Sequence, residues 1–314
     1  MPNKPVLKTI RALAPATVAN VSCGFDVFGF AVESPADEVI LTLTDDPGVV
    51  IKEITGDDGR LPLDASKNTS GVAVQAFLRA LDSSVGVEIV LHKKLPLGSG
   101  MGSSAASSVA ALVAINELFD RPFTRDQLLP FAMEAERIAC GSAHADNVAP
   151  SLLGGFVLIR AYEPLDVTRI PTPPDLFCTL VHPHLELKTS DSRRVLKATI
   201  SMKDAITQWG NIAGLVVGLM KPDYGLIQRS LNDVVAEPIR SVLIPGFKRI
   251  KEVALRNGAL GAGISGSGPT IFALSTEYSI AEGVGKAIQE QFTGLKLESD
   301  VFVSRINTTG ARIA

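Results

Sequence analysis

The chain has 314 residues, of which 46% are hydrophobic and 20% are charged, and its formal net charge is −3. These values predict a globular protein with one large or two medium domains rather than a disordered chain. No basic block suggests nucleic-acid binding, and no apolar stretch approaches the roughly 20 residues of a membrane span. Cys23, Cys140 and Cys178 have neither zinc-site nor disulfide spacing, so we expect a reduced, cytoplasmic protein.

Hydrophobic periodicity predicts alternating strands and helices in the first half of the chain. Strands are expected at residues 7–13, 39–44, 49–54, 87–91 and 156–159. Helices are expected at residues 69–81, 105–119, 124–141 and 146–152. Thr124 and Gln127 have the spacing of a capping box at the start of the third helix, and Pro130 predicts a kink in that helix or a later start.

Four prolines between residues 164 and 174 predict a domain boundary. The first domain is expected to span residues 1–165 and the second residues 166–314. In the second half, strands are expected at residues 177–182, 270–274 and 301–306, and helices at 191–198, 203–220, 224–234, 247–257 and 280–292. Both halves mix strands and helices, so the predicted fold class is α+β.

The most informative segment is the Gly- and Ser-rich run from Leu95 to Ala106, which lies between an expected strand and an expected helix. Glycines let the backbone approach a phosphate closely, while the free N–H groups and the dipole of a helix start favour negative charge. Ser103 and Ser104 add hydroxyls, one of which could reach a metal ion. The run predicts an anion site, with a tight structural turn before a capped helix as the alternative.

Two other nucleotide-binding patterns fit less well. The run lacks the Lys-Ser or Lys-Thr pair of a P-loop, and Ser103 stands where a dinucleotide fingerprint has its third glycine. A second run, residues 261–266, matches the dinucleotide pattern in its letters, but an expected helix precedes it and an expected strand follows. This context is the reverse of the one required, which disfavours a dehydrogenase.

Further polar residues could line a pocket, although each group alone is more typical of a protein surface. In chain order they are Asn20 and Asp26 after a strand end, Glu134 and Glu136 on a helix, His144, Asp146 and Asn147 ahead of Gly154, and Thr189, Arg193 and Arg240 in the second half. A carboxylate can complete a Mg²⁺ site, and arginine suits bidentate binding of a carboxylate or phosphate.

Together these segments resemble the GHMP kinases, which include galactokinase, homoserine kinase and mevalonate kinase. Residues 15–29, 98–104 and 263–270 resemble the three motifs of the family in their order. Residues 15–26, residues 144–147 and the Thr189–Arg193 spacing are similar to the homoserine kinases in particular. The resemblance runs from about Arg11 to the C-terminus. It implies an N-terminal domain like domain 2 of ribosomal protein S5, a ferredoxin-like C-terminal domain and an active site between them.

The resemblance also implies ATP-dependent phosphorylation of L-homoserine for threonine biosynthesis, with Mg²⁺ and a homodimer. Asn68 would lie near the adenine, with Lys93 as a second candidate, and Ser104 and Glu136 would hold Mg²⁺. The ATP-binding run would comprise Pro96, Leu97, Gly98, Ser99, Gly100, Met101, Gly102, Ser103, Ser104, Ala105 and Ala106. The amino-acid pocket would comprise Asn20, Asp26, His144, Asn147, Thr189, Arg193 and Arg240.

In this pocket Arg193 and Arg240 would bind the homoserine carboxylate, Asp26 the ammonium and Asn147 the hydroxyl. Mevalonate kinase-like members carry an aspartate where Asn147 stands, and an amide cannot accept the hydroxyl proton. Catalysis would then rest on positioning and electrostatics, with the proton passing to the γ-phosphate. The adjacent Asp146 is expected to point elsewhere. The chain departs from the homoserine kinases at residues 22–23, where Ser-Cys replaces Gly-Pro.

Two other functions stay open on the sequence alone. The first is a kinase for another small alcohol of the mevalonate or shikimate type, although such substrates lack the ammonium that would pair with Asp26. The second is a nucleotide-binding regulator without catalysis. The presence of both Mg²⁺ candidates, Ser104 and Glu136, disfavours the regulator.

Overall fold

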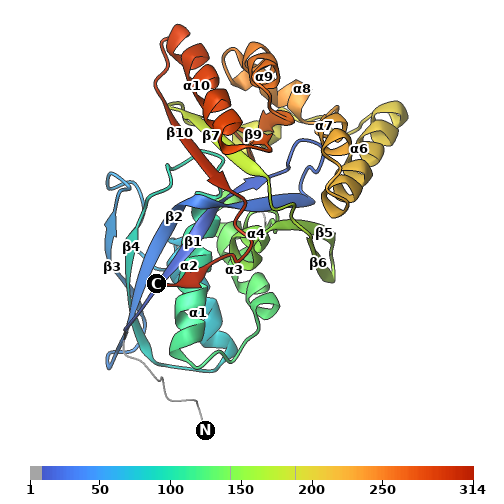
Figure 1. Ribbon diagram of the computed structural model, residues 1–314. Coiled ribbons are helices and arrows are strands. Elements are labelled where there is room, and N and C mark those ends of the chain that lie inside the picture. Colours follow the sequence, from blue (N-terminus) through green and yellow to red (C-terminus); the bar gives the residue numbers. More distant parts are fainter. Residues whose placement is uncertain (1–8, 142, 188) are drawn as a thin grey trace.

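The computed structural model describes residues 9–141, 143–187 and 189–314, and two β-sheets organise them (Figure 1). The first sheet has the strand order β11-β1-β2-β4-β3, with β5 pairing with both β2 and β6. Its strands are β1 (Thr9–Ala19), β2 (Phe28–Thr44), β3 (Val49–Thr55), β4 (Gly86–His92), β5 (Phe156–Tyr162), β6 (Leu165–Ile170) and β11 (Arg312–Ile313). The second sheet has the order β10-β7-β9-β8.

Four helices of the first half pack together beside the first sheet (Figure 1). They are α1 (Thr69–Ala80), α2 (Ser103–Leu118), α3 (Arg125–Cys140) and α4 (Val148–Leu153). Nearly every residue of α2 is buried, because small and apolar side chains surround the helix on all sides. α2 contacts β1 and β2 as well as α1 and α3, so its N-terminus is fixed by the core of this half.

The second sheet is built from β7 (Phe177–Pro183), β8 (Gly261–Ile264), β9 (Ile271–Ser275) and β10 (Ser299–Arg305). Helices α9 (Phe247–Arg256) and α10 (Tyr278–Gly294) pack on it and share its apolar core. The remaining elements are α5 (Thr189–Arg194), α6 (Met202–Met220), α7 (Tyr224–Ser230), α8 (Glu237–Arg240) and the 3₁₀ turn η1 (Ser241–Leu243). No described helix is long and apolar enough to cross a membrane.

Several predicted elements begin or end elsewhere than expected. The strand expected at 7–13 continues to Ala19 through a register shift between Pro15 and Thr17, and residues 7 and 8 lie outside the described residues. The strand expected at 39–44 begins already at Phe28. The helix expected at 191–198 spans Thr189–Arg194 and is shorter. The capping box of α3 is present, and Pro130 lies inside a helix that begins at Arg125.

The segment expected to form the domain boundary is not a simple linker. It contains β6, which pairs with β5 in the first sheet. β11 near the C-terminus also pairs in the first sheet, with β1. The first sheet therefore takes strands from both sides of the predicted division after residue 165, which stays a prediction.

The second glycine run forms a β-hairpin rather than a nucleotide-binding turn. Residues 261–264 are β8, which pairs antiparallel with β9. A dinucleotide fingerprint requires a strand, a turn and a helix in that order. The structure therefore excludes this run as a dinucleotide site.

Candidate active site

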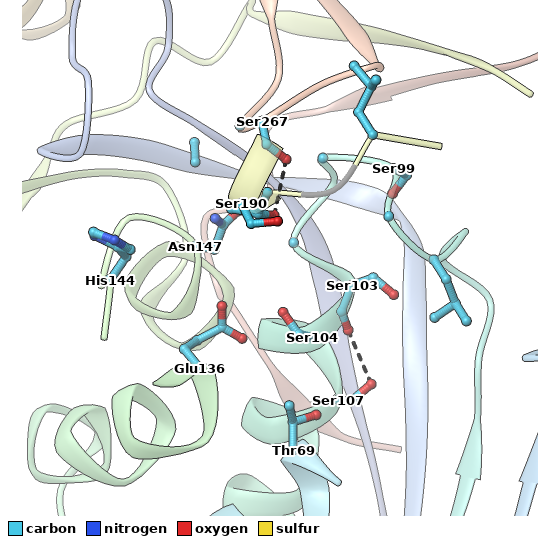
Figure 2. Close-up of a pocket in the computed structure, with 18 of the residues that line it drawn as sticks. Thr69, Ser99, Ser103, Ser104, Ser107, Glu136, His144, Asn147, Ser190 and Ser267 are labelled. Atoms are coloured by element: carbon cyan, nitrogen blue, oxygen red, sulfur yellow. Dashed lines mark hydrogen bonds between the residues drawn. The ribbon is translucent and has the colours of Figure 1, made fainter. Parts of the chain in front are cut away.

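A cavity of about 590 Å³ lies where the two halves meet, and both glycine runs border it. It is lined by most of the phosphate-binding candidates between Leu97 and Ser104 and by all seven residues expected in the amino-acid pocket. Figure 2 shows Ser103 and Ser104 at the start of α2 on one side, with Glu136, His144 and Asn147 on the other. The structure thus gathers residues that lie far apart in the sequence.

The Gly- and Ser-rich run from Leu95 to Ala106 is called the phosphate loop below. Its glycines have backbone conformations that residues with side chains rarely adopt. Gly98, Gly100 and Gly102 have φ angles of 64°, 79° and 69°. Gly102 is the N-cap of α2, and no side chain among the described residues caps this end. The first-turn N–H groups of α2 are therefore presented toward the cavity without a side-chain cap, as an anion site requires.

Gly100 also packs against the second glycine run. A Cβ atom there would overlap the carbonyl of Ser265 and lie 2.7 Å from the carbonyl oxygen of Gly268. Ser265 Oγ donates to the carbonyl of Gly100 at 2.8 Å, and the Thr270 N–H donates to the carbonyl of Ser99 at 3.2 Å. The second run therefore supports the phosphate loop, a role that sequence spacing did not reveal.

Lys93 forms a buried brace beneath the same loop. Its ammonium pairs with Asp37 and donates at 2.8 Å to both the Ser103 carbonyl and Ser107 Oγ. Asp37 also accepts hydrogen bonds from the N–H groups of Lys94 and Leu95. Burial lowers the pKa of Lys93, against the attraction of Asp37. Although Lys93 borders the cavity, its ammonium is bound by Asp37 of β2 and by the first turns of α2.

Asn68, the predicted adenine neighbour, borders the cavity at the N-terminus of α1. Its side-chain oxygen accepts a hydrogen bond from the Ser70 N–H at 3.0 Å and caps the helix, while its amide nitrogen donates to the Pro62 carbonyl. Asn68 therefore holds this edge of the cavity in shape.

Ser104 and Glu136 face each other across the cavity, and Glu136 is buried on α3 (Figure 2). A hydroxyl and a carboxylate are oxygen donors of the kind that Mg²⁺ binds alongside substrate phosphates. Among the described residues no group of three or more His, Cys, Asp and Glu side chains could hold a metal ion. This donor set fits Mg²⁺ carried with a nucleotide.

At the other end of the cavity, Asp26 and Arg193 bind each other. Arg193 donates two hydrogen bonds to the Asp26 carboxylate, at 2.8 and 3.0 Å. Arg240 is buried, donates to the carbonyls of Ser192 and Gly266, and lies over the ring of Phe25. The residues predicted to bind the ammonium and the carboxylate of one substrate are thus partners of each other in this structure.

Asn20 has a left-handed backbone, with φ at 70°, and its side chain joins two loops. Its oxygen accepts from the Asp26 N–H at 3.0 Å, and its nitrogen donates to the Gly266 carbonyl at 2.8 Å. His144 Nδ1 lies 3.9 Å from Asp26 Oδ1. Burial lowers the pKa of His144, against the attraction of Asp26, and so favours the neutral imidazole.

The sequence predicts that Asp146 points away from the site, but the structure places Asp146 at the cavity. It precedes α4 rather than lying in it, borders the cavity and is buried. Burial raises the pKa of Asp146 to about 7, and the nearby carboxylates of Asp26 and Glu136 contribute.

Asn147 accepts a hydrogen bond from Thr17 Oγ1 at 2.7 Å, and Thr189 Oγ1 lies 3.4 Å from Ser267 Oγ.

Some residues of the predicted ATP-binding run do not line the cavity. Met101, Ala105 and Ala106 are fully buried in the core, and they and Pro96 are not among the residues that border the cavity. Sequence reasoning missed Arg60 and Glu186, which border the cavity and form an ion pair with two hydrogen bonds of 2.8 and 2.7 Å. Neither belongs to a recognisable motif, so the sequence offered no signal for them.

Comparisons with known proteins agree with this geometry. The family model "GHMP kinases N terminal domain" matches residues 68–155, and "GHMP kinases C terminal" matches residues 215–294. A homoserine kinase of Chlorobium phaeovibrioides is 54% identical over 98% of this chain and 100% of its own length. One from Xylella fastidiosa is 40% identical over 98% of this chain and 95% of its own length.

Solved structures give the same result. A homoserine kinase from Cytophaga hutchinsonii is 55% identical and has a TM-score of 0.96, with 98% of both chains covered. The L. major mevalonate kinase is 16% identical with a TM-score of 0.73, covering 97% of this chain and 99% of its own, and so shares the fold. The predicted α+β fold of a GHMP kinase is confirmed. The chain belongs to the homoserine kinase family of the GHMP kinases.

Proposed function

We propose that the protein transfers the γ-phosphoryl group of ATP to the hydroxyl of L-homoserine, forming O-phospho-L-homoserine for threonine biosynthesis. One observation carries this proposal. A helix N-terminus suited to phosphates and a charged pair suited to an amino acid border the same cavity, in Gly102–Ser104 and in Asp26 with Arg193. Phosphoryl transfer depends mainly on positioning and on charge stabilisation, which this arrangement supplies.

At the nucleotide end, the N–H groups of the first turn of α2 would bind the phosphates, with the helix dipole adding to the attraction. Ser104 and Glu136 would hold Mg²⁺, which neutralises charge on the transferring phosphoryl group when it is bound. The brace of Lys93 and Asp37 beneath the loop keeps these groups in place.

At the amino-acid end, homoserine brings one ammonium and one carboxylate. It would replace the Asp26–Arg193 pair by two new pairs, with its ammonium on Asp26 and its carboxylate on Arg193 beside Arg240. Asp26 and Arg193 then each have a charged partner both before and after homoserine binds. This avoids the free-energy cost of several kcal/mol that an uncompensated buried charge carries. Mevalonate and shikimate carry no ammonium, so a kinase for either would leave Asp26 unmatched.

The substrate hydroxyl would lie by Asn147, whose amide can hold it but cannot accept its proton. Two acceptors remain for that proton, an oxygen of the γ-phosphoryl group and the carboxylate of Asp146. The raised pKa of Asp146 matches the range in which general bases work near neutral pH. Either way the products are ADP, phosphohomoserine and one proton.

We also propose that two copies of the chain pair through α6. This helix lies at the edge of the molecule (Figure 1), and its outer face exposes an apolar row three or four residues apart. The row comprises Met202, Ile206, Trp209, Ala213, Val217 and Met220. It is nearly symmetric about residue 211, so antiparallel pairing would set Trp209 against the small Ala213 of a second copy. Such self-matching is what a two-fold interface requires.

We place the reaction in the cytoplasm because the described cysteines, Cys23 and Cys178, are buried free thiols, which suits a reducing compartment.

The deciding experiment measures phosphoryl transfer from ATP and Mg²⁺ by the purified protein to L-homoserine, mevalonate, shikimate and 4-hydroxybutyrate, with products identified by mass spectrometry. We expect L-homoserine to exceed each of the others in kcat/KM by at least about 100-fold, the ratio given by one unmatched buried charge. Preference for another alcohol would overturn the substrate. ATP binding without turnover of any of them would indicate a regulator.

A further inference from the structure

Thr17 links the phosphate loop to the substrate side of the cavity without bordering the cavity itself. It lies in β1 with an exposed fraction of 0%. Its N–H donates to the carbonyl of Met101 at 3.0 Å, and its Oγ1 donates to Asn147 Oδ1 at 2.7 Å. One buried residue therefore contacts both the nucleotide loop and the residue expected to hold the acceptor hydroxyl.

Gly102 closes this link from the side of the helix. A Cβ atom at Gly102 would overlap Thr17 Oγ1 and would lie 2.9 Å from Asn147 Oδ1. Both atoms of the hydrogen bond thus pack directly against the N-cap of α2. Because this contact is tight, α2 and the Asn147 side chain cannot shift independently of each other.

The hydrogen bond also fixes how Asn147 presents its amide. A carboxamide has an acceptor oxygen and a donor nitrogen on opposite sides, and the Thr17 hydroxyl binds the oxygen. Asn147 borders the cavity, so its nitrogen is left as the donor for the oxygen of an incoming hydroxyl. A loss of the Thr17 hydroxyl would free the amide to rotate.

We propose that Thr17 is a positioning residue that sets the amide of Asn147 against the phosphate loop, and thereby aligns the acceptor hydroxyl with the γ-phosphoryl group. This rests on the proposed phosphotransfer. Alignment contributes much of the rate in such reactions, and a displacement of about 1 Å costs roughly 100-fold. Thr17 therefore acts on the chemical step and not on the binding of either substrate.

The test compares Thr17→Val, which keeps the shape and the β-branch but removes the hydroxyl, with Thr17→Ser, which keeps the hydroxyl. We expect Thr17→Val to lower kcat roughly 10- to 100-fold with both KM values within about threefold of wild type. Thr17→Ser should keep kcat within about threefold of wild type. Thr179→Val is the matched control, because Thr179 is also a fully buried strand residue, in β7 of the second sheet, and its hydroxyl donates to the Ala281 carbonyl of α10. It should leave kcat unchanged.

A second measurement separates positioning from a fold defect. In an Asn147→Ala background, Thr17→Val should cause no further loss of kcat, since the amide it orients is gone. An equal further loss there, a wild-type kcat in Thr17→Val, or a failure of Thr17→Ser to retain activity would each overturn the proposal. If Thr17→Val does not fold, Thr17→Ala and Thr17→Ser decide it by the same comparison. If the wild-type protein phosphorylates a different alcohol, the variants are assayed with that alcohol, so failure of the substrate assignment stays distinct.

Discussion

The guanidinium of Arg193 and the carboxylate of Asp26 form a two-bond ion pair at 2.8 and 3.0 Å, although 167 residues separate them. Each is about a quarter to a third exposed at the cavity wall. A pair of this kind is ready to exchange for a ligand that carries both charges. This makes the ammonium of the substrate the point at which the proposal is most easily tested.

Asp26→Asn should therefore lower kcat/KM for L-homoserine by about 100-fold or more, because an amide cannot neutralise the ammonium. The loss for 4-hydroxybutyrate, which has no ammonium, should be much smaller. The measurement is kcat/KM for both substrates in both proteins. Asp166→Asn, which alters an exposed ion pair on β6, is the control and should change neither value. Equal losses for the two substrates would show that Asp26 does not recognise the ammonium.

Glu136→Gln should lower kcat by about 100-fold and move the Mg²⁺ dependence to higher concentration, because the metal neutralises charge on the transferring group. The matched control is Glu134→Gln, two residues earlier on α3, whose carboxylate pairs with Arg79 at the surface. Initial rates across a Mg²⁺ titration compare the three proteins. A wild-type rate at every Mg²⁺ concentration in Glu136→Gln would remove Glu136 from the metal site.

Two glycines of the phosphate loop should respond differently to the same substitution. Gly98 and Gly100 both have positive φ, so alanine costs about 1–2 kcal/mol of backbone strain at either. At Gly98 the new Cβ would meet the flexible side chain of Glu186, whereas at Gly100 it would overlap the backbone of Ser265. Gly100→Ala should therefore lower stability, measured by urea unfolding, more than Gly98→Ala does. It should also lower ATP affinity, measured by calorimetry, more than Gly98→Ala does. Equal effects would mean that contact with the second glycine run is unimportant.

Much of the fold was predictable where the signal is local. The helix after the glycine run and the capping box of α3 follow from short-range periodicity and capping chemistry, and α2 and α3 begin and end close to the predicted residues. The bounds of a strand are harder to predict where pairing with a distant strand determines them. β1 continues past Pro15 because a register shift accommodates it against β2, and no local pattern encodes that shift.

The candidate site was also predictable only in part, because some of its features depend on long-range contacts. All seven residues that the family resemblance assigns to the amino-acid pocket, from Asn20 to Arg240, border the cavity. The family motifs did not reveal which side chains bind each other, because contacts such as Arg60 with Glu186 depend on how the two halves meet. The helix expected to begin at residue 146 also misplaced Asp146, which precedes α4 and borders the cavity.

Trp209→Glu should convert a dimer into a monomer, because it puts a charge into the centre of the apolar row on α6. Trp209 is 60% exposed within one copy, so the fold itself should tolerate the change. The control is Thr207→Glu, an exposed residue of α6 that lies off the row. Light scattering at tens of micromolar protein measures the mass of each. A monomeric wild type, or a dimer that survives Trp209→Glu, would exclude pairing through this helix.

Asp146 gives a prediction for stability against pH. Its pKa rises from 3.8 to about 7 in the folded protein, chiefly through burial. Between these values the native state holds a proton that the unfolded state has released, so stability falls as pH rises. The contribution of protonated Asp146 is complete below about pH 4 and is lost as the pH rises through about 7.

Asp146→Asn keeps the neutral form at every pH, so its urea midpoint should fall less than that of wild type between about pH 5 and about pH 8. Ligand-free protein is used, because bound phosphates would change the charge around the carboxylate. Asp191→Asn, at an exposed aspartate of α5, is the control and should follow the wild type. Parallel curves for Asp146→Asn and wild type would show that Asp146 titrates as an ordinary carboxylate and cannot serve as a proton acceptor tuned to neutral pH.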